Sequence, residues 1–143
     1  MARCNNWPAK LALFVEEKRN QPFVWGENDC ALFTCDWIII LTGADCAAEL
    51  RGRYRTALGA SRLLRRFGGL ERLIEGNAEE FGWKEIPVRA AQRGDIVIAF
   101  LPENRAAMPC AVGVVVGAKA VFAGTAGIVF VPLLQCARAW RVD

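Results

Sequence analysis

The stretch that decides the fold reads Asn28-Asp-Cys-Ala-Leu-Phe-Thr-Cys-Asp-Trp-Ile-Ile-Ile-Leu-Thr-Gly43. Between residues 30 and 41 it is apolar in nearly every direction around a helix, and Asp36 is the only charged residue there. Asn28 and Asp29 are residue types that cap helix N-termini, and Gly43 suits the left-handed conformation in which many helices end. A helix that is apolar all round packs inside a protein. We therefore expect residues 30–41 to form a central, buried helix.

Three further helices are predicted in the first half of the chain. Pro8 is suited to the first turn of a helix after the capping-type pair Asn5-Asn6, and apolar residues continue at helical spacing to residue 19. Apolar periodicity also predicts two short amphipathic helices, over residues 57–67 and 70–81, on either side of the Gly68-Gly69 break. The N-terminal half of the chain is therefore expected to be helical.

From Trp83 onward the pattern changes to short runs of β-branched and small apolar residues. Five such runs are predicted to be strands: residues 95–101, 111–116, 120–122, 128–131 and 139–142. Turn residues separate them, at Pro102-Glu-Asn104, Gly117, Gly124 and Gly127. Helices followed by strands, rather than alternating with them, are typical of α+β proteins. We expect one domain over residues 1–143, with a helical half (about 1–82) packed on an antiparallel sheet of about five strands (about 83–143).

The composition is that of a globular domain and excludes several kinds of chemistry. Hydrophobic residues make up 54% of the 143 residues, enough to bury a core, and the net charge of +3 is too small to indicate a nucleic-acid partner by itself. The chain contains no histidine. Chemistry that needs an imidazole of this chain, as a general base, proton shuttle or zinc ligand, is therefore excluded.

The six cysteines, at positions 4, 30, 35, 46, 110 and 136, are expected to be reduced thiols. The N-terminal residues lack the apolar segment of a signal peptide, and disulfides are rare in proteins that are not exported. No pair has the Cys-x-x-Cys spacing of common metal sites, so we expect no metal and no other cofactor. The longest apolar run, residues 37–41, is far shorter than the roughly 20 residues that cross a bilayer, so no membrane span is expected.

Cys30 is the cysteine whose position suggests reactivity. It falls in the first turn of the predicted central helix, where unpaired backbone N–H groups and the helix dipole favour a thiolate. The same N–H groups could stabilise an oxyanion formed by attack on a carbonyl carbon. A cysteine that only packs in the core is the competing interpretation, because free cysteines are among the most buried residue types.

The sequence around Cys30 resembles the nucleophile motif of NlpC-type cysteine peptidases. The stretch Pro22-Phe-Val-Trp-Gly-Glu-Asn-Asp-Cys-Ala-Leu-Phe33 is similar to the aromatic-x-Trp-Gly and Asp-Cys-small-x-Phe pattern of that family. Further along, Arg93-Gly-Asp-Ile-Val97 resembles the Pro-Gly-Asp-Leu-Val of its first strand, and Ala111-Val-Gly-Val-Val-Val-Gly117 resembles the next strand, normally His-Val-Gly-Ile-x-x-Gly. The resemblance implies a papain-like fold in which Cys30 is the nucleophile or its remnant.

Ala111 stands at the position where the resemblance places the catalytic histidine. The residue that orients this histidine would fall near Ala123 or Gly124, and neither has a polar side chain. A paired base deprotonates the thiol and protonates the leaving amine, and losing such acid–base help costs roughly 10²–10⁴-fold in rate. The resemblance therefore implies a pseudo-peptidase.

A closer resemblance is to small proteins encoded in the tail modules of phages and prophages. The shared motifs are Trp25-Gly-Glu-Asn-Asp-Cys30, Gly52-Arg-Tyr54 and the C-terminal Ala139-Trp-Arg-Val142. This resemblance implies a structural or assembly protein of the tail tip or hub, made in the host cytoplasm and carried in the virion. Its partners would be other tail-tip and hub proteins, and the degenerate cleft could still bind a peptidoglycan peptide.

The residues around Cys30 have expected roles of their own. Trp25, Gly26 and Asp29 are expected to line the cleft beside the thiol, and Asp29 is expected above all to cap the helix. Asp36 lies nearly two helical turns beyond Cys30 and cannot reach the thiol. It is expected instead to pair within the protein, with an arginine of the 51–55 segment.

Arg51, Arg53 and Arg55 open an arginine-rich segment, residues 51–72, and are expected to contact a partner protein. Aromatic residues are too sparse there to favour a nucleic-acid-binding module, which is the less favoured alternative. The other alternative is an active thiol hydrolase of peptidoglycan stem peptides that uses Cys30 with an unconventional base.

Overall fold

The central helix forms as its capping residues predict. The computed structural model describes residues 2–100 and 110–143, and in it helix α2 spans Cys30–Thr42. The Asp29 side chain accepts a hydrogen bond from the backbone N–H of Leu32, and Gly43 ends the helix in the left-handed conformation. Trp37 is fully buried in the middle of α2, and its indole N–H donates to the carbonyl of Gly94 at 3.1 Å.

The other three helices also lie where they were expected. Helix α1 spans Trp7–Lys18, α3 spans Ala57–Arg66, and α4 spans Leu70–Phe81. The N-terminus of α1 is not capped by a side chain, although the pair Asn5-Asn6 had suggested such a cap. Asn6 adopts a left-handed conformation (φ 63°), and its side chain makes no capping hydrogen bond. Asparagine tolerates that conformation better than most residues, so it turns the chain into the helix through its backbone.

A six-stranded antiparallel sheet, with strand order β1-β6-β2-β3-β4-β5, forms the C-terminal half of the described chain. The strands are β1 (Lys84–Ile86), β2 (Ile96–Ala99), β3 (Ala111–Val115), β4 (Lys119–Gly124), β5 (Gly127–Pro132) and β6 (Arg138–Arg141). Two short 3₁₀ helices, Val88–Ala90 and Leu133–Gln135, lie between strands. The α+β class, with helices N-terminal and strands C-terminal, is confirmed.

The described sheet has one strand more than the expected five or so, because β1 was not predicted from the sequence. This strand has three residues, two of them charged and exposed, so it lacks the apolar alternation by which a strand is recognised. Its partner is β6, with Lys84 opposite Arg141, and that pairing joins segments far apart in the sequence. The predicted turn at Pro102-Glu-Asn104 lies outside the described residues.

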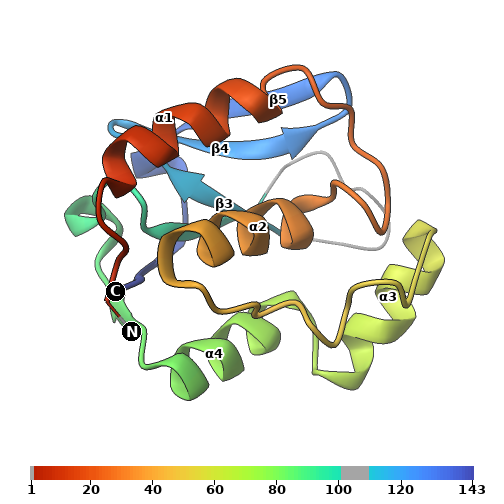
Figure 1. Ribbon diagram of the computed structural model, residues 1–143. Helices are drawn as coiled ribbons and strands as arrows, with labels where there is room; N and C mark the ends of the chain where they lie inside the picture. The colour runs from red at the N-terminus through yellow and green to blue at the C-terminus, as the bar shows by residue number, and fades with distance from the viewer. Residues whose placement is uncertain (1, 101–109) are drawn as a thin grey trace.

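The core lies between α2 and the sheet. Figure 1 shows α2 in the centre of the molecule, with α1 on the side of β4 and β5 and α4 on its other side. Phe14 of α1 packs against Phe33 and Trp37 of α2, with ring centroids 5.1 and 5.7 Å apart. All four residues of β2 and all five of β3 are buried, so both faces of these central strands are covered.

A buried carboxylate ties the two ends of the chain to the sheet. Asp95, just before β2, is fully buried and forms ion pairs with Arg3 at 2.6 Å and Arg141 at 3.4 Å. The Arg3 side chain also donates to the carbonyl of Val142 at 2.8 Å. The N- and C-terminal ends therefore lie close together, as Figure 1 shows. Asp95 thus has a structural role.

No helix of the described residues is long and apolar enough to cross a membrane.

Candidate functional site

The thiol of Cys30, at the first position of α2, is buried against the sheet with 4% of the residue exposed. Burial raises its pKa from 9.0 to about 12, although hydrogen bonds with the backbone of Val112 and Ala31 act in the opposite direction. The charge of nearby Asp29 raises the pKa further. The expectation that the helix N-terminus would favour a thiolate is therefore wrong for this structure, since desolvation outweighs the backbone N–H groups.

Strand β3 faces Cys30 and supplies no base. Val112, whose backbone contacts the Cys30 thiol, also accepts a hydrogen bond from the Thr34 hydroxyl, one turn further along α2, at 3.2 Å. Ala111 immediately precedes Val112 on the strand and is buried. The position at which the sequence resemblance places a histidine is thus one residue from the backbone that contacts the thiol, and its side chain is only a methyl group. Cys110, just before the strand, is also buried, and burial raises its pKa to about 11.

Asp29, next to Cys30, is 1% exposed and accepts three hydrogen bonds. They come from the backbone N–H of Gly26 at 2.9 Å, the backbone N–H of Leu32 at 3.0 Å and the Tyr54 hydroxyl at 2.5 Å. The expectation that Asp29 caps α2 is confirmed. Its carboxylate oxygens bind the loop at Gly26, the first turn of α2 and the Tyr54 side chain. Asp29 therefore does not act on the thiol as an orienting base.

Tyr54 is the site residue that sequence reasoning did not assign. It is buried, and burial together with the neighbouring Asp29 carboxylate raises the pKa of its phenol well above the ordinary value of 10. The hydroxyl therefore keeps its proton and donates a hydrogen bond to the Asp29 carboxylate. The Gly52-Arg-Tyr54 motif was the available signal, but a motif does not say which residue, 25 positions earlier, its tyrosine will contact.

The loop before Cys30 is packed onto the Tyr54 backbone. Gly26 has a left-handed φ of 83°, and a Cβ added to it would lie 2.2 Å from the carbonyl oxygen of Tyr54. Trp25 is half-buried and packs edge-on against Phe23, with ring centroids 4.7 Å apart. Gly26 therefore lies at a close backbone contact with the Tyr54 segment. The loop as a whole thus helps to fix the position of the first turn of α2.

Two surface pockets lie elsewhere in the described part of the chain, and neither is lined by Cys30. One, of about 420 Å³, lies between α4 and the 45–50 turn, and the other, of about 430 Å³, lies along the loop before α2. The second is lined by Lys18, Gln21, Pro22, Val24, Glu27 and Asn28. The structure therefore places the Cys30 thiol beside Asp29 and against the backbone of Val112, and it encloses the thiol.

The arginines that were expected to bind a partner have different environments. Arg51 forms ion pairs with Asp36 at 2.8 Å and Asp45 at 3.0 Å, so its guanidinium is used within the protein. The predicted pairing of Asp36 with an arginine of the 51–55 segment is confirmed by the same contact. Arg53 and Arg55 are exposed, and neither forms an ion pair with a described carboxylate.

The described residues contain no group of three or more cysteine, aspartate or glutamate side chains placed to hold a metal ion. The fold and the site thus define an α+β protein with a buried cysteine at the start of its central helix and no imidazole. The chain belongs to a family described as a domain of unknown function (DUF6950), which matches residues 2–142. A search of the curated proteins finds no match. The family match includes the loop, α2, the Tyr54 segment and all six strands.

Proposed function

We propose that this protein is a catalytically inactive relative of NlpC-type cysteine peptidases, with a papain-like fold, that serves as a structural or assembly component of a phage tail tip or hub. The observation that carries the inactive site is the environment of Cys30. Its thiol is buried with a pKa near 12, and the strand facing it carries Ala111 where a base would be needed. A peptidase of this kind needs a thiolate and an acid for the leaving amine, and this site supplies neither.

The architecture around the thiol supports a scaffold. Asp29 joins the loop, α2 and Tyr54 through three hydrogen bonds, and Gly26 permits the close contact of the loop with the Tyr54 backbone. These residues belong to the motifs that resemble the phage tail proteins. Each has a local structural role, so the motifs can persist in a protein that performs no hydrolysis.

The partner surface would lie on the arginine-rich segment. Arg53 and Arg55, together with Arg62, Arg65 and Arg66 of α3, are exposed, and the described residues offer them no paired carboxylate. Arginine is enriched at protein interfaces because its guanidinium combines planar packing with several hydrogen-bond donors. An acidic surface on a neighbouring tail protein would match this charge. The virion would then be where the protein functions, after synthesis in the host cytoplasm.

The experiment is complementation of a phage or prophage that lacks its own copy of this gene. Cys30→Ala should restore infectious particles as well as the native protein, whereas Arg53→Glu/Arg55→Glu should reduce both the yield and the amount of this chain in purified tails. Lys10→Glu/Arg89→Glu is the matched control, because it makes the same charge change at exposed residues outside the arginine-rich segment.

The alternative functions give different results in the same assay. Loss of complementation by Cys30→Ala, together with release of stem-peptide fragments from peptidoglycan by the native protein, would identify an active hydrolase. Salt-dependent binding of DNA or RNA that is lost in Arg53→Glu/Arg55→Glu would identify a nucleic-acid-binding module. Either result would overturn the proposal.

A further inference from the structure

Two other cysteines meet inside the molecule, away from Cys30. The Cys46 thiol, in the turn after α2, donates a hydrogen bond to the sulfur of Cys35 in α2, with the two sulfur atoms 2.7 Å apart. This is closer than two unbonded sulfur atoms normally approach. A disulfide has an S–S length of about 2.05 Å, so a small movement would bring the pair to bonding distance. Both residues are free thiols in the structure.

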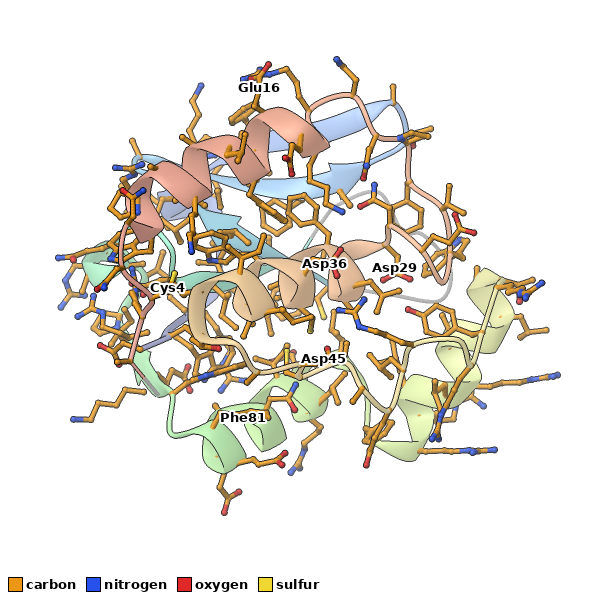
Figure 2. All side chains as sticks on the ribbon, in the orientation of Figure 1. Cys4, Glu16, Asp29, Asp36, Asp45 and Phe81 are labelled. Atoms are coloured by element: carbon orange, nitrogen blue, oxygen red, sulfur yellow. The ribbon has the colours of Figure 1, made fainter. Side chains whose placement is uncertain are left out.

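An arginine fixes the segments that carry the two thiols. Asp36 follows Cys35 and Asp45 precedes Cys46, and Arg51 forms ion pairs with both carboxylates. Figure 2 shows Asp36 on α2 and Asp45 on the segment that passes below it. Because one guanidinium binds the neighbours of both cysteines, the two sulfur atoms are held facing each other. The ion pairs of Arg51 therefore position the Cys35 and Cys46 thiols relative to each other.

The pair can be reached from solvent on one side. Cys46 lines the pocket of about 420 Å³ between the 45–50 turn and α4, whereas Cys35 lies deeper, on the buried face of α2. A pocket of this size has room for a small thiol-containing molecule, and it exposes Cys46 first.

We propose that Cys35 and Cys46 are a thiol–disulfide exchange site whose co-reactant is a low-molecular-weight disulfide such as oxidised glutathione. The Cys46 thiolate attacks one sulfur of the small disulfide, forming a mixed disulfide and releasing the first thiol. Cys35 then loses its proton and attacks the Cys46 sulfur, forming the Cys35–Cys46 disulfide and releasing the second thiol. Two protein thiols are oxidised and one small disulfide is reduced to two thiols.

The order of these steps follows from the environments of the two sulfur atoms. The small disulfide meets Cys46 first, because Cys46 lines the pocket. The Cys35 thiol lies deeper, and its pKa is raised above the ordinary value by the hydrogen bond with Cys46 and next by burial. The site is independent of the function proposed for the whole protein, because the exchange uses only the sulfur atoms of Cys35 and Cys46 and needs neither Cys30 nor a tail partner. Cys136 provides an internal reference, because it is buried to a degree similar to that of Cys46. Burial raises the pKa of Cys136 to about 11.

The test is oxidation of the folded native protein in glutathione buffers of graded redox potential, followed by trapping of free thiols and mapping of disulfides by peptide mass spectrometry. The expected product is a single Cys35–Cys46 disulfide, with the protein lighter by two hydrogen atoms. Its formation should be at least about tenfold faster than glutathione addition at Cys136, since it begins at a thiol that lines a pocket and ends in a closed ring. Reduction with excess glutathione should restore both thiols.

Two variants separate positioning by Arg51 from general stability. Arg51→Gln releases both carboxylates, so it should lower the yield of the disulfide several-fold and leave glutathione attached to Cys46. Lys18→Gln is the matched control, because Lys18 binds Asp36 at 3.1 Å but is not paired with Asp45. It should leave the yield unchanged.

Three results would overturn the proposal, and each can be read from the native protein alone. Both thiols could stay free in buffers that fully oxidise a short dithiol peptide. The disulfide could form between Cys30 and Cys110 instead. The reaction could also stop at the mixed disulfide on Cys46, which would show that Cys35 does not reach it.

Discussion

Replacing Gly26 by alanine tests how firmly the loop before Cys30 is fastened to the Tyr54 segment. The new Cβ would lie 2.2 Å from the Tyr54 carbonyl oxygen, and the residue would have to adopt a φ of 83°. Gly43→Ala is a matched control, because Gly43 has the same φ and no heavy atom lies within 4 Å of its added Cβ. The two variants therefore share the backbone strain and differ in the clash.

The magnitudes follow from these two contributions. A left-handed conformation costs an L-residue about 1–2 kcal/mol, which both variants incur. Forcing an extra methyl group into a filled space costs a further ~1–3 kcal/mol, and here the obstacle is backbone, which cannot rotate away. We expect Gly26→Ala to lose about 2–5 kcal/mol of unfolding free energy and Gly43→Ala only about 1–2 kcal/mol.

Urea unfolding at 25 °C, followed by far-ultraviolet circular dichroism, measures both losses. The slope of free energy against urea should stay the same in both variants, so that the change appears in the midpoint alone. Equal losses in the two variants would refute the close packing of the loop on Tyr54.

Two further predictions concern hydrogen bonds and ion pairs of the described structure. Tyr54→Phe removes the hydroxyl from buried Asp29 and should cost about 1.5–3 kcal/mol in urea unfolding, whereas Glu16→Gln, at an exposed pair with Arg19, should change stability by less than about 0.5 kcal/mol. Equal effects in these two variants would show that the Tyr54–Asp29 bond is not made in solution. The hydrogen bond from Arg138 holds the pKa of Glu85 below its ordinary value of 4.5, so its contribution to stability is present above that pH and is lost as the pH falls through the lower folded value. Arg138→Gln should therefore flatten the fall in unfolding free energy below about pH 4.5, and an unchanged acid profile would contradict this ion pair.

The elements that could be predicted from the sequence are those governed by local chemistry. Helix α2 has a side-chain cap at Asp29 and a glycine end at Gly43, and both act within one turn of the helix. The switch from helices to strands near Trp83 likewise shows in the residue types themselves. Strand β1 could not be predicted, because its three residues carry no apolar pattern of their own. It is stabilised by pairing with β6, more than fifty residues away in the sequence.

Some members of the candidate site could be predicted from the sequence, but Tyr54 and the environment of the thiol could not. The motifs placed Cys30 at a helix start and Ala111 in a strand, and the structure has α2 begin at Cys30 and β3 at Ala111. The pKa of the thiol depends on how much water the surrounding elements exclude, and no local pattern reports that burial. The Tyr54–Asp29 bond and the contact of Cys35 with Cys46 are likewise set by tertiary packing.

The central claim, that Cys30 is a buried thiol without catalytic activation, is tested most directly by the pH dependence of its alkylation with iodoacetamide in the folded protein. With a pKa near 12, about one Cys30 in ten thousand would be a thiolate at pH 8, roughly a thousandfold fewer than for an ordinary thiol. We predict that peptide mass spectrometry will find Cys30 unmodified from pH 6 to 9 in the native protein and fully modified after unfolding in urea. Rapid native modification with an apparent pKa below about 8.5 would contradict the account, because the site would then stabilise a thiolate and the protein would have to be treated as a thiol enzyme.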